Sequence, residues 1–179
     1  MISSEAINLG DSVTINAKAA GGSGKYTYGV YYRKSTSQKW STAQSYKANS
    51  TVKITPAAGV DYDICVKVTD SYGTITTKYF TVKVSIPSLI NKSTISANTI
   101  KKGESVTITA KAIGGQGKYT YAIYYKKSTS EKWTTVQSFS TKSTAMITPA
   151  AAIKYNICVK VKDSSGKIVD KNFDITCTN

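Results

Sequence analysis

The sequence predicts an all-β protein made of two tandem immunoglobulin-like β-sandwich domains. Three observations support this fold class. The chain repeats itself at a fixed offset, its apolar residues alternate with a period of two rather than 3.6, and glycine-containing turns separate the alternating segments at short intervals. With 179 residues, the chain is long enough for two domains of about 90 residues each.

The internal repeat defines the domain organisation. Sliding the sequence against itself by 93 residues aligns Ser3–Ile86 with Ser96–Asn179 without a gap, and roughly 47 of the 84 aligned pairs are identical. We therefore expect one domain over residues 1–85 and a second over residues 96–179. The segment 86–95 between them contains Pro87 and is predicted to be a short linker.

Each strand of the first copy follows from its local pattern, and the second copy repeats the pattern. A short strand is expected around Ile7, followed by the alternating residues from Val13 to Ala19. Pro56 follows and ends the expected strand Ser50–Thr55, and Asp70 with Gly73 marks a hairpin turn. About seven strands in roughly 85 residues match the size of an immunoglobulin-like sandwich. The remaining strands are expected at Tyr26–Lys34, Trp40–Tyr46, Ser50–Thr55, Tyr62–Val68 and around Phe80–Val84.

The same alternation assigns side chains to the two faces of each sheet. Tyr62 and Ile64 are expected to point inward, which turns Cys65 and its equivalent Cys158 toward the outer face. Cys177 is expected to be a small buried hydrophobe. Tyr62 and Tyr155 occupy the position of the tyrosine corner of such folds. In the tyrosine-rich strands the predicted inward residues are Tyr28, Val30, Tyr32, Tyr121, Ile123 and Tyr125, and the predicted outward residues include Tyr31 and Arg33.

Composition excludes several classes of function. The absence of histidine removes imidazole as a general base or metal ligand, and no nucleophile or phosphate-loop motif surrounds the many hydroxyl groups. The three cysteines have no short metal-binding spacing. We therefore expect no enzymatic activity, no metal and no cofactor. The acidic residues that recur in both copies include Asp70 and Asp163, which sit where a hairpin favours aspartate.

Both copies resemble a known bacterial family. The segments GGSGKYTYGVYYRKSTSQKW and GGQGKYTYAIYYKKSTSEKW, with YDICVKVTDS and its copy, resemble tandem immunoglobulin-like repeats with a triple-tyrosine motif. Such repeats are found in extracellular proteins of Gram-positive gut bacteria, and the resemblance covers nearly the whole chain. It implies the fold and a secreted or cell-surface location. It also implies one of two roles, a spacer in cell-wall proteins or a starch-binding module similar to those of amylosome proteins.

Aromatic and polar residues suggest where a carbohydrate could bind. A sugar ring stacks on an exposed aromatic side chain, while its hydroxyl groups need polar partners beside that ring. Trp40 and Trp133 each follow a polar loop, and one tyrosine of the neighbouring strand in each copy is expected to face outward. The predicted ligand-binding residues are Trp40, Trp133, Tyr31, Tyr124, Lys34, Lys127, Gln44 and Gln137. Two copies of a weak site favour a polymeric ligand, and we expect a starch or α-1,4-glucan polymer.

The net charge and the distribution of basic residues also fit other functions. The net charge of +14 fits a structural spacer or adhesin stalk, or a module that binds anionic cell-wall polymers. The basic residues form no run of five or more, so nucleic-acid binding is not expected. No window approaches 18 consecutive apolar residues, and residues Met1–Glu5 carry no signal pattern, so no membrane insertion is expected. We expect a monomeric piece of a larger multidomain surface protein.

Overall fold

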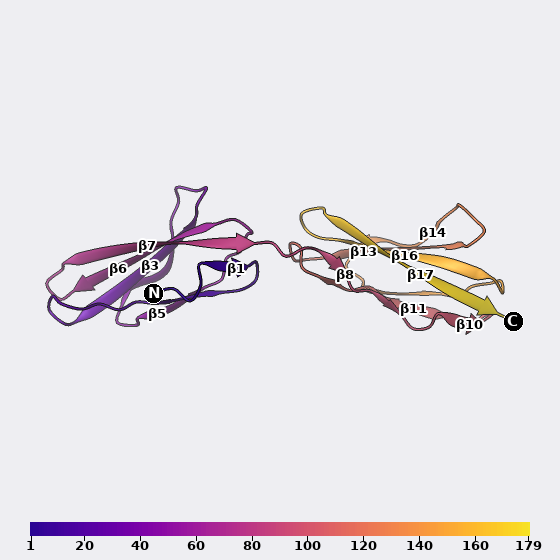
Figure 1. The fold of residues 1–179 in the computed structure, drawn as a ribbon, viewed down its shortest axis with the longest axis horizontal. Coiled ribbons are helices and arrows are strands. Elements are labelled where there is room, and N and C mark those ends of the chain that lie inside the picture. Colours follow the sequence, from indigo (N-terminus) through magenta and orange to yellow (C-terminus); the bar gives the residue numbers. More distant parts are fainter. The chain divides into compact units, whose positions relative to one another are not determined.

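A computed structural model describes all residues from 1 to 179 and divides the chain into two compact units, Met1–Pro87 and Ser88–Asn179. Both units consist of strands and loops, so the predicted all-β sandwich fold is confirmed (Figure 1). Each unit packs a five-stranded sheet over a smaller sheet. The structure contains no helix that is long and apolar enough to cross a membrane.

Unit 1 has the seven strands that the sequence predicts. Its large sheet has the order β1-β7-β6-β3-β4, in which β1 pairs with β7 in parallel and the other neighbours are antiparallel. The small sheet pairs β2 with β5. The bounds are β1 (Ala6–Asn8), β2 (Val13–Asn16), β3 (Tyr26–Lys34), β4 (Ser41–Lys47), β5 (Thr51–Ile54), β6 (Tyr62–Asp70) and β7 (Ile75–Ser85).

Unit 2 repeats this arrangement and adds short strands. Its large sheet has the order β10-β17-β16-β13-β14, and the facing strands are ordered β15-β11-β9, with a separate pair β12-β8. The bounds are β8 (Ile90–Asn91), β9 (Thr94–Ile95), β10 (Thr99–Lys101), β11 (Val106–Thr109), β12 (Ala112–Ile113), β13 (Thr120–Lys127), β14 (Thr134–Ser140), β15 (Thr144–Ile147), β16 (Lys154–Lys162) and β17 (Ile168–Thr178).

The core of each unit lies between its sheets. Valine and isoleucine at alternate positions fill it, as expected for strands with one face buried. In unit 1 the fully buried side chains include Val13 and Ile15 of β2, Val30 of β3, Ile64 of β6 and Val82 of β7. The same positions in unit 2 are buried in an equivalent cluster. The inner-face assignments from the sequence therefore agree with the structure.

Most of the segment expected to be a linker belongs to unit 2. Residues 86–95 include β8 and β9, which pair antiparallel with β12 and β11 respectively. Leu89 is only 4% exposed and lies in the unit 2 core, and Asn91 and Ser93 are buried as well. The connection between the units is therefore shorter than 86–95. The sequence prediction missed these strands because the first copy offers no aligned counterpart for residues 88–93.

Tyr62, Tyr155 and the hairpin residue Asp70 have structural roles. Tyr155 is 3% exposed, and its hydroxyl donates to Ala151 O at 3.4 Å, four residues upstream, as in a tyrosine corner. Tyr62 is 4% exposed and packs beside Tyr32. At the β6–β7 hairpin, Asp70 Oδ1 accepts hydrogen bonds from Tyr72 N and Thr74 N, both at 3.0 Å.

Candidate functional site

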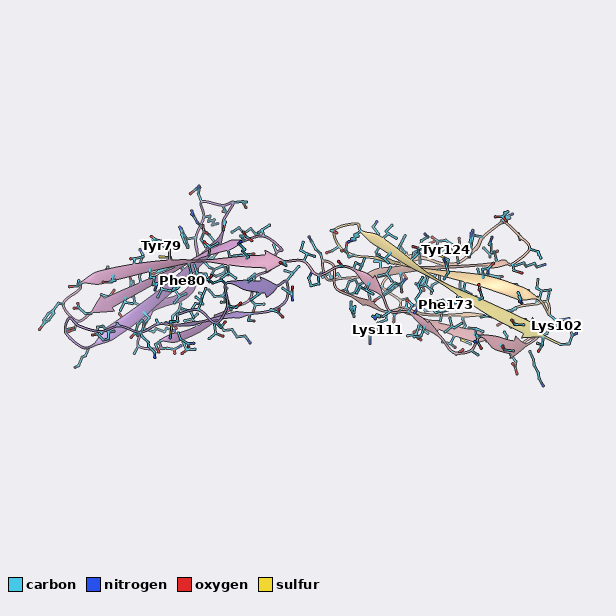
Figure 2. All side chains as sticks on the ribbon, in the orientation of Figure 1. Tyr79, Phe80, Lys102, Lys111, Tyr124 and Phe173 are labelled. Atoms are coloured by element: carbon cyan, nitrogen blue, oxygen red, sulfur yellow. The ribbon has the colours of Figure 1, made fainter.

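A row of side chains crosses the outer face of the large sheet in unit 1. Strand register places Tyr79 of β7 beside Cys65 of β6, Cys65 beside Tyr31 of β3, and Tyr31 beside Thr42 of β4. Because successive side chains of a strand alternate between faces, all four lie on the side away from the core. Figure 2 shows Tyr79 on the opposite side of β7 from its neighbour Phe80, which packs against the core.

Trp40 joins this row and completes a pocket. Tyr31, Trp40 and Tyr79 surround a hollow of about 220 Å³, with Cys65 and Lys67 also in its lining. The ring centroids of Trp40 and Tyr79 are 6.3 Å apart and their planes meet at 50°. We call this hollow, and its equivalent in unit 2, the ring pocket. The predicted pair Tyr31 and Trp40 is thus brought together.

Arg33 fixes the position of Trp40. Its guanidinium lies 4.8 Å from the centre of the indole ring, which is a favourable cation–π distance. The guanidinium is itself held by Asp63 Oδ2 at 3.0 Å and by Gln38 Oε1 at 3.1 Å. One side of the indole is therefore supported by a charge that is anchored to the sheet.

A second ring extends the apolar surface beyond Tyr31. A Cβ added at Gly29 would lie 3.1 Å from the Tyr31 ring and 3.4 Å from the Tyr46 ring, so both rings cover this glycine. Tyr46 is 40% exposed. Unit 2 has Ala122 and Phe139 at the positions of Gly29 and Tyr46. An aromatic side chain beside the pocket is therefore retained in both units.

The ring pocket of unit 2 is larger and has more polar residues in its lining. It encloses about 360 Å³ and is lined by Tyr124, Trp133, Cys158, Lys160, Asp170 and Asn172. Asn172 takes the place of Tyr79, so one ring is replaced by an amide. Trp133 is 41% exposed, and its cation is Lys126, whose Nζ lies 5.4 Å from the ring centre. Tyr124 lies on the large sheet in Figure 2.

The cysteines beneath the rings are buried, although the strand pattern turns them outward. Cys65 is 4% and Cys158 6% exposed. Their side chains belong to the outer face, and each lines its ring pocket together with a tyrosine and a tryptophan. Burial raises the pKa of the Cys158 thiol, while the nearby Lys160 ammonium acts in the opposite direction. Cys177 is buried, as the sequence predicts.

The two predicted glutamines do not line the ring pockets. Gln44 Nε2 donates to Tyr28 O at 2.9 Å and to Asn49 O at 2.8 Å. Gln137 Nε2 makes the same two bonds, to Tyr121 O and Lys142 O. These amides lie where the register between the tyrosine-rich strand and the edge strand β4 or β14 shifts. The Nε2 donors of Gln44 and Gln137 stabilise the backbone at these shifts, so both side chains have a structural role.

The two predicted lysines also lie outside the ring pockets. Lys34 and Lys127 end β3 and β13 and are exposed. They differ from Tyr31 and Tyr124 by an odd number of residues, so alternation turns them to the other side of the strand. The cations beside the rings are Arg33 and Lys67 in unit 1, and Lys126 and Lys160 in unit 2.

Sequence reasoning therefore missed Tyr79, Arg33 and Lys67. The signal for Tyr79 was available, because apolar residues at the alternate positions Phe80, Val82 and Val84 favour one face of the strand and turn Tyr79 to the other. Arg33 was likewise placed outward, but its distance from Trp40 depends on the loop between β3 and β4. What the pattern cannot supply is the strand order that brings β7 beside β6.

The chemistry that the ring pockets offer is binding through ring faces and hydrogen-bonding groups. The carboxylates nearest the rings are in ion pairs, Asp63 with Arg33 and Asp170 with Lys160, the latter at 3.9 Å. The structure has no group of three or more cysteine, aspartate or glutamate side chains that could hold a metal ion. Tyr72, in the hairpin between β6 and β7, is 83% exposed and lies outside the ring pocket.

Comparisons with solved structures find tandem β-sandwich domains of the fibronectin type III-like class. The FN1–FN3 domains of chicken CNTN1 are 13% identical over 98% of this chain and 66% of that chain, with a TM-score of 0.40. The fibronectin(III)-like modules of Clostridium thermocellum CbhA are 18% identical over 99% of this chain and 94% of that chain, with a TM-score of 0.36. No protein-family model and no curated protein matches the sequence. Neither structural likeness bears on the ligand.

Proposed function

We propose that each unit is a non-catalytic module that binds a polysaccharide, most specifically an α-1,4-glucan, at its ring pocket. The observation that carries this proposal is the group of Tyr31, Trp40 and Tyr79 around one hollow, with Tyr124 and Trp133 in the equivalent place in unit 2. Aromatic rings that remain partly exposed provide surfaces for the C–H faces of sugars.

In unit 1 the geometry of the rings favours a curved chain. Because the planes of Trp40 and Tyr79 meet at 50°, two successive sugars stacked on them must be inclined to each other. An α-1,4-glucan has such a bend, whereas a flat β-1,4-glucan suits coplanar rings. Lys67 lies on the pocket wall beside these rings and can donate to sugar hydroxyls.

Duplication supports a polymeric ligand. When one chain carries two sites, binding at the first raises the effective concentration at the second, commonly to the millimolar range for a short connection. Two modest ring pockets would then retain a long glucan that neither holds firmly alone. In this proposal the chain acts as a monomeric part of a secreted or cell-surface protein.

Affinity electrophoresis through gels containing amylose or amylopectin tests the proposal. The wild-type chain should be retarded, and the double variant Trp40→Ala/Trp133→Ala should migrate as in a gel without glucan. Tyr72→Ala is the matched control, because it removes an exposed ring outside the ring pocket. Equal retardation of the double variant would contradict the proposed site. Depletion by cellulose or chitin, but not by starch granules, would contradict the proposed glucan.

A structural spacer that adheres to anionic wall polymers is the second candidate. The observation in its favour is the net charge of +14, together with a cation beside the tryptophan in both units. Charge attraction is screened by salt, whereas ring stacking changes little. Binding to an anionic wall polymer that disappears between about 0.05 and 0.5 M salt, with no retardation by glucan, would favour the spacer.

A further inference from the structure

Residues 88–93 run along unit 2 in an extended segment that contains the short strand β8 (Ile90–Asn91). β8 pairs antiparallel with β12, with Asn91 beside Ala112, and Lys92 N donates to Lys111 O at 2.8 Å. The alternate side chains of Leu89, Asn91 and Ser93 point into the unit and are 4%, 8% and 0% exposed. This segment therefore completes one side of unit 2.

Specific contacts hold the three inward residues. Leu89 covers Gly115, where an added Cβ would lie 3.1 Å from Leu89 Cδ1. Asn91 Nδ2 donates to Val159 O at 2.8 Å and to Val169 O at 3.3 Å.

The backbone and hydroxyl of Ser93 are bonded as well. Ser93 O accepts a hydrogen bond from Lys171 Nζ at 2.8 Å, and Ser93 Oγ accepts one from Lys111 N at 3.1 Å. The apolar side chain of Leu89, the amide of Asn91 and the hydroxyl of Ser93 therefore each contact a partner group in unit 2.

Unit 1 contains nearly the same receptor residues. Lys18, Ala19, Gly22, Val66 and Lys78 are identical to the residues that contact this strand in unit 2. Ser88–Ser93 have no aligned counterpart in unit 1.

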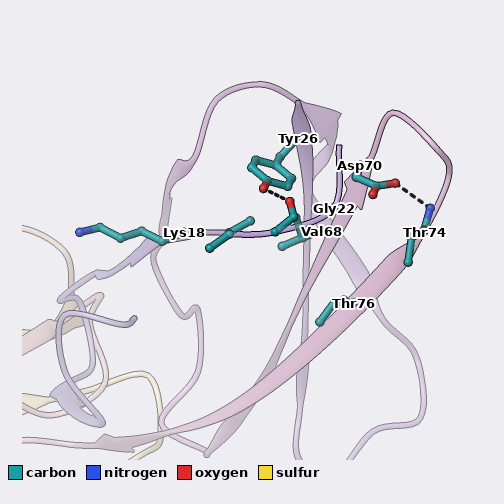
Figure 3. A pocket seen from close by; sticks show the side chains of 10 residues that line it. Lys18, Gly22, Tyr26, Val68, Asp70, Thr74 and Thr76 are labelled. Carbon is teal, nitrogen blue, oxygen red and sulfur yellow. Dashed lines mark hydrogen bonds between the residues drawn. The ribbon is translucent and has the colours of Figure 1, made fainter. Parts of the chain in front are cut away.

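A groove lies at the equivalent place in unit 1. Two pockets of about 320 and 150 Å³ share Lys18, Val68 and Thr76 in their linings. We call them together the strand groove. Figure 3 shows the larger one, with Val68 and Thr76 from the large sheet and the segment of Lys18 and Gly22 along its side.

Residues beside the strand groove of unit 1 are less buried than their equivalents in unit 2. Val68 is half-buried, while its equivalent Val161 is fully buried. Asp70 is likewise half-buried, while Asp163 is 5% exposed. The segment 17–20 forms no strand, whereas β12 forms in unit 2. Unit 1 therefore leaves apolar surface and backbone polar groups open where unit 2 covers them.

We propose that the strand groove of unit 1 is an acceptor site for an extended peptide with the pattern Leu-x-Asn-x-Ser. The peptide adds antiparallel to the segment 18–20. Its Leu covers Gly22, its Asn amide donates to Val66 O and Thr76 O, and the carbonyl of its Ser accepts a hydrogen bond from Lys78 Nζ. Adding a strand to an open edge provides main-chain affinity, and the alternate side chains provide specificity.

The first test adds the strand to the full chain itself. Ser-Leu-Ile-Asn-Lys-Ser is fused ahead of residue 1 in a Trp133→Phe background, so that Trp40 reports the unfolding of unit 1. The midpoint of thermal unfolding should rise by about 5–10 °C. The matched control carries the same extension with its Leu and Asn replaced by Lys, and it should leave the midpoint unchanged.

The second test adds the strand as a separate peptide. A synthetic Ser-Leu-Ile-Asn-Lys-Ser peptide with blocked ends is titrated into the ¹⁵N-labelled full chain. Amide signals of residues 18–22 should shift, and those of unit 2 should not. Thr76→Arg changes an exposed residue that lines both pockets, so it should abolish the shifts while leaving the remaining spectrum intact.

Three results would overturn the proposal. The first is an extension that stabilises unit 1 no more than its lysine control. The second is equal binding of a peptide with the same residues in scrambled order. The third is a concentration-dependent dimer that Leu89→Ser abolishes, because the groove would then belong to a second copy of this chain. These outcomes do not depend on glucan binding, which occurs on the other face of the large sheet.

Discussion

Asn91→Ala should destabilise unit 2 strongly while leaving unit 1 unchanged. Asn91 is 8% exposed, and its amide joins the added strand to carbonyl groups of β16 and β17. Its Oδ1 also accepts hydrogen bonds from Ser93 N at 3.1 Å and from Ser93 Oγ at 2.6 Å. Alanine removes all four bonds and leaves a buried backbone carbonyl and a buried hydroxyl without these partners.

The size of the effect follows from those bonds. A buried hydrogen bond contributes about 1 kcal/mol net, and a group left unpaired costs somewhat more. Allowing for the weaker bond at 3.3 Å, the free energy of unfolding of unit 2 should fall by about 3 kcal/mol. For a domain of this size, urea lowers the free energy of unfolding by about 1–1.5 kcal/mol per molar, so the midpoint should fall by about 2 M.

Tryptophan fluorescence can follow each unit separately, because each contains one tryptophan. In a Trp40→Phe background, Trp133 reports the urea unfolding of unit 2 in the full chain. Asn98→Ala is the matched control, since Asn98 is exposed and lies in the same unit. A midpoint shift below about 0.5 M for Asn91→Ala would refute the reasoning, because residues 88–93 would then behave as a linker.

Three further predictions concern the ring pockets and acid stability. Arg33→Ala should weaken retardation by amylose about threefold to tenfold, since the indole of Trp40 loses the cation that holds it; unchanged mobility would contradict this role. Cys158 should react slowly with a thiol reagent at pH 8, because burial raises its pKa, and bound glucan should slow the reaction further in a Cys65→Ser/Cys177→Ser background. The hydrogen bond from the Ser165 hydroxyl, followed by backbone bonds, lowers the pKa of Asp163. Its contribution to stability is therefore present above about pH 4 and is lost as the pH falls below that value, so Asp163→Asn should flatten the acid limb of a stability–pH profile of unit 2.

The fold was predictable because it rests on local alternation. The observed β3 has the expected bounds Tyr26–Lys34, and the inward assignments of Val30 and Ile64 hold because a shift of one residue would expose the core face. The exceptions are β8 and β9, whose two residues each are too few to show a period. The identity of β8 depends on contacts with residues 68 positions later in the chain.

The candidate site was predictable only in part, because it depends on strand order. Tyr31 and Trp40 are near in sequence, with only the end of β3 and the loop before β4 between them, so their proximity could be inferred. Tyr79 reaches the ring pocket only because β7 pairs with β6. Gln44 was expected to bind ligand because it follows Trp40 closely in the sequence. Its amide is instead bonded to the carbonyl of Tyr28, a contact that the sequence does not reveal.

The register shifts at β4 and β14 have a consequence for association between molecules. Both strands lie at the edge of a large sheet, where unpaired backbone groups could recruit a strand from another molecule. An irregular, locally twisted border is a poor template for such pairing. By anchoring these irregularities, Gln44 and Gln137 disfavour edge-to-edge strand pairing between molecules and the insoluble fibres that such pairing produces.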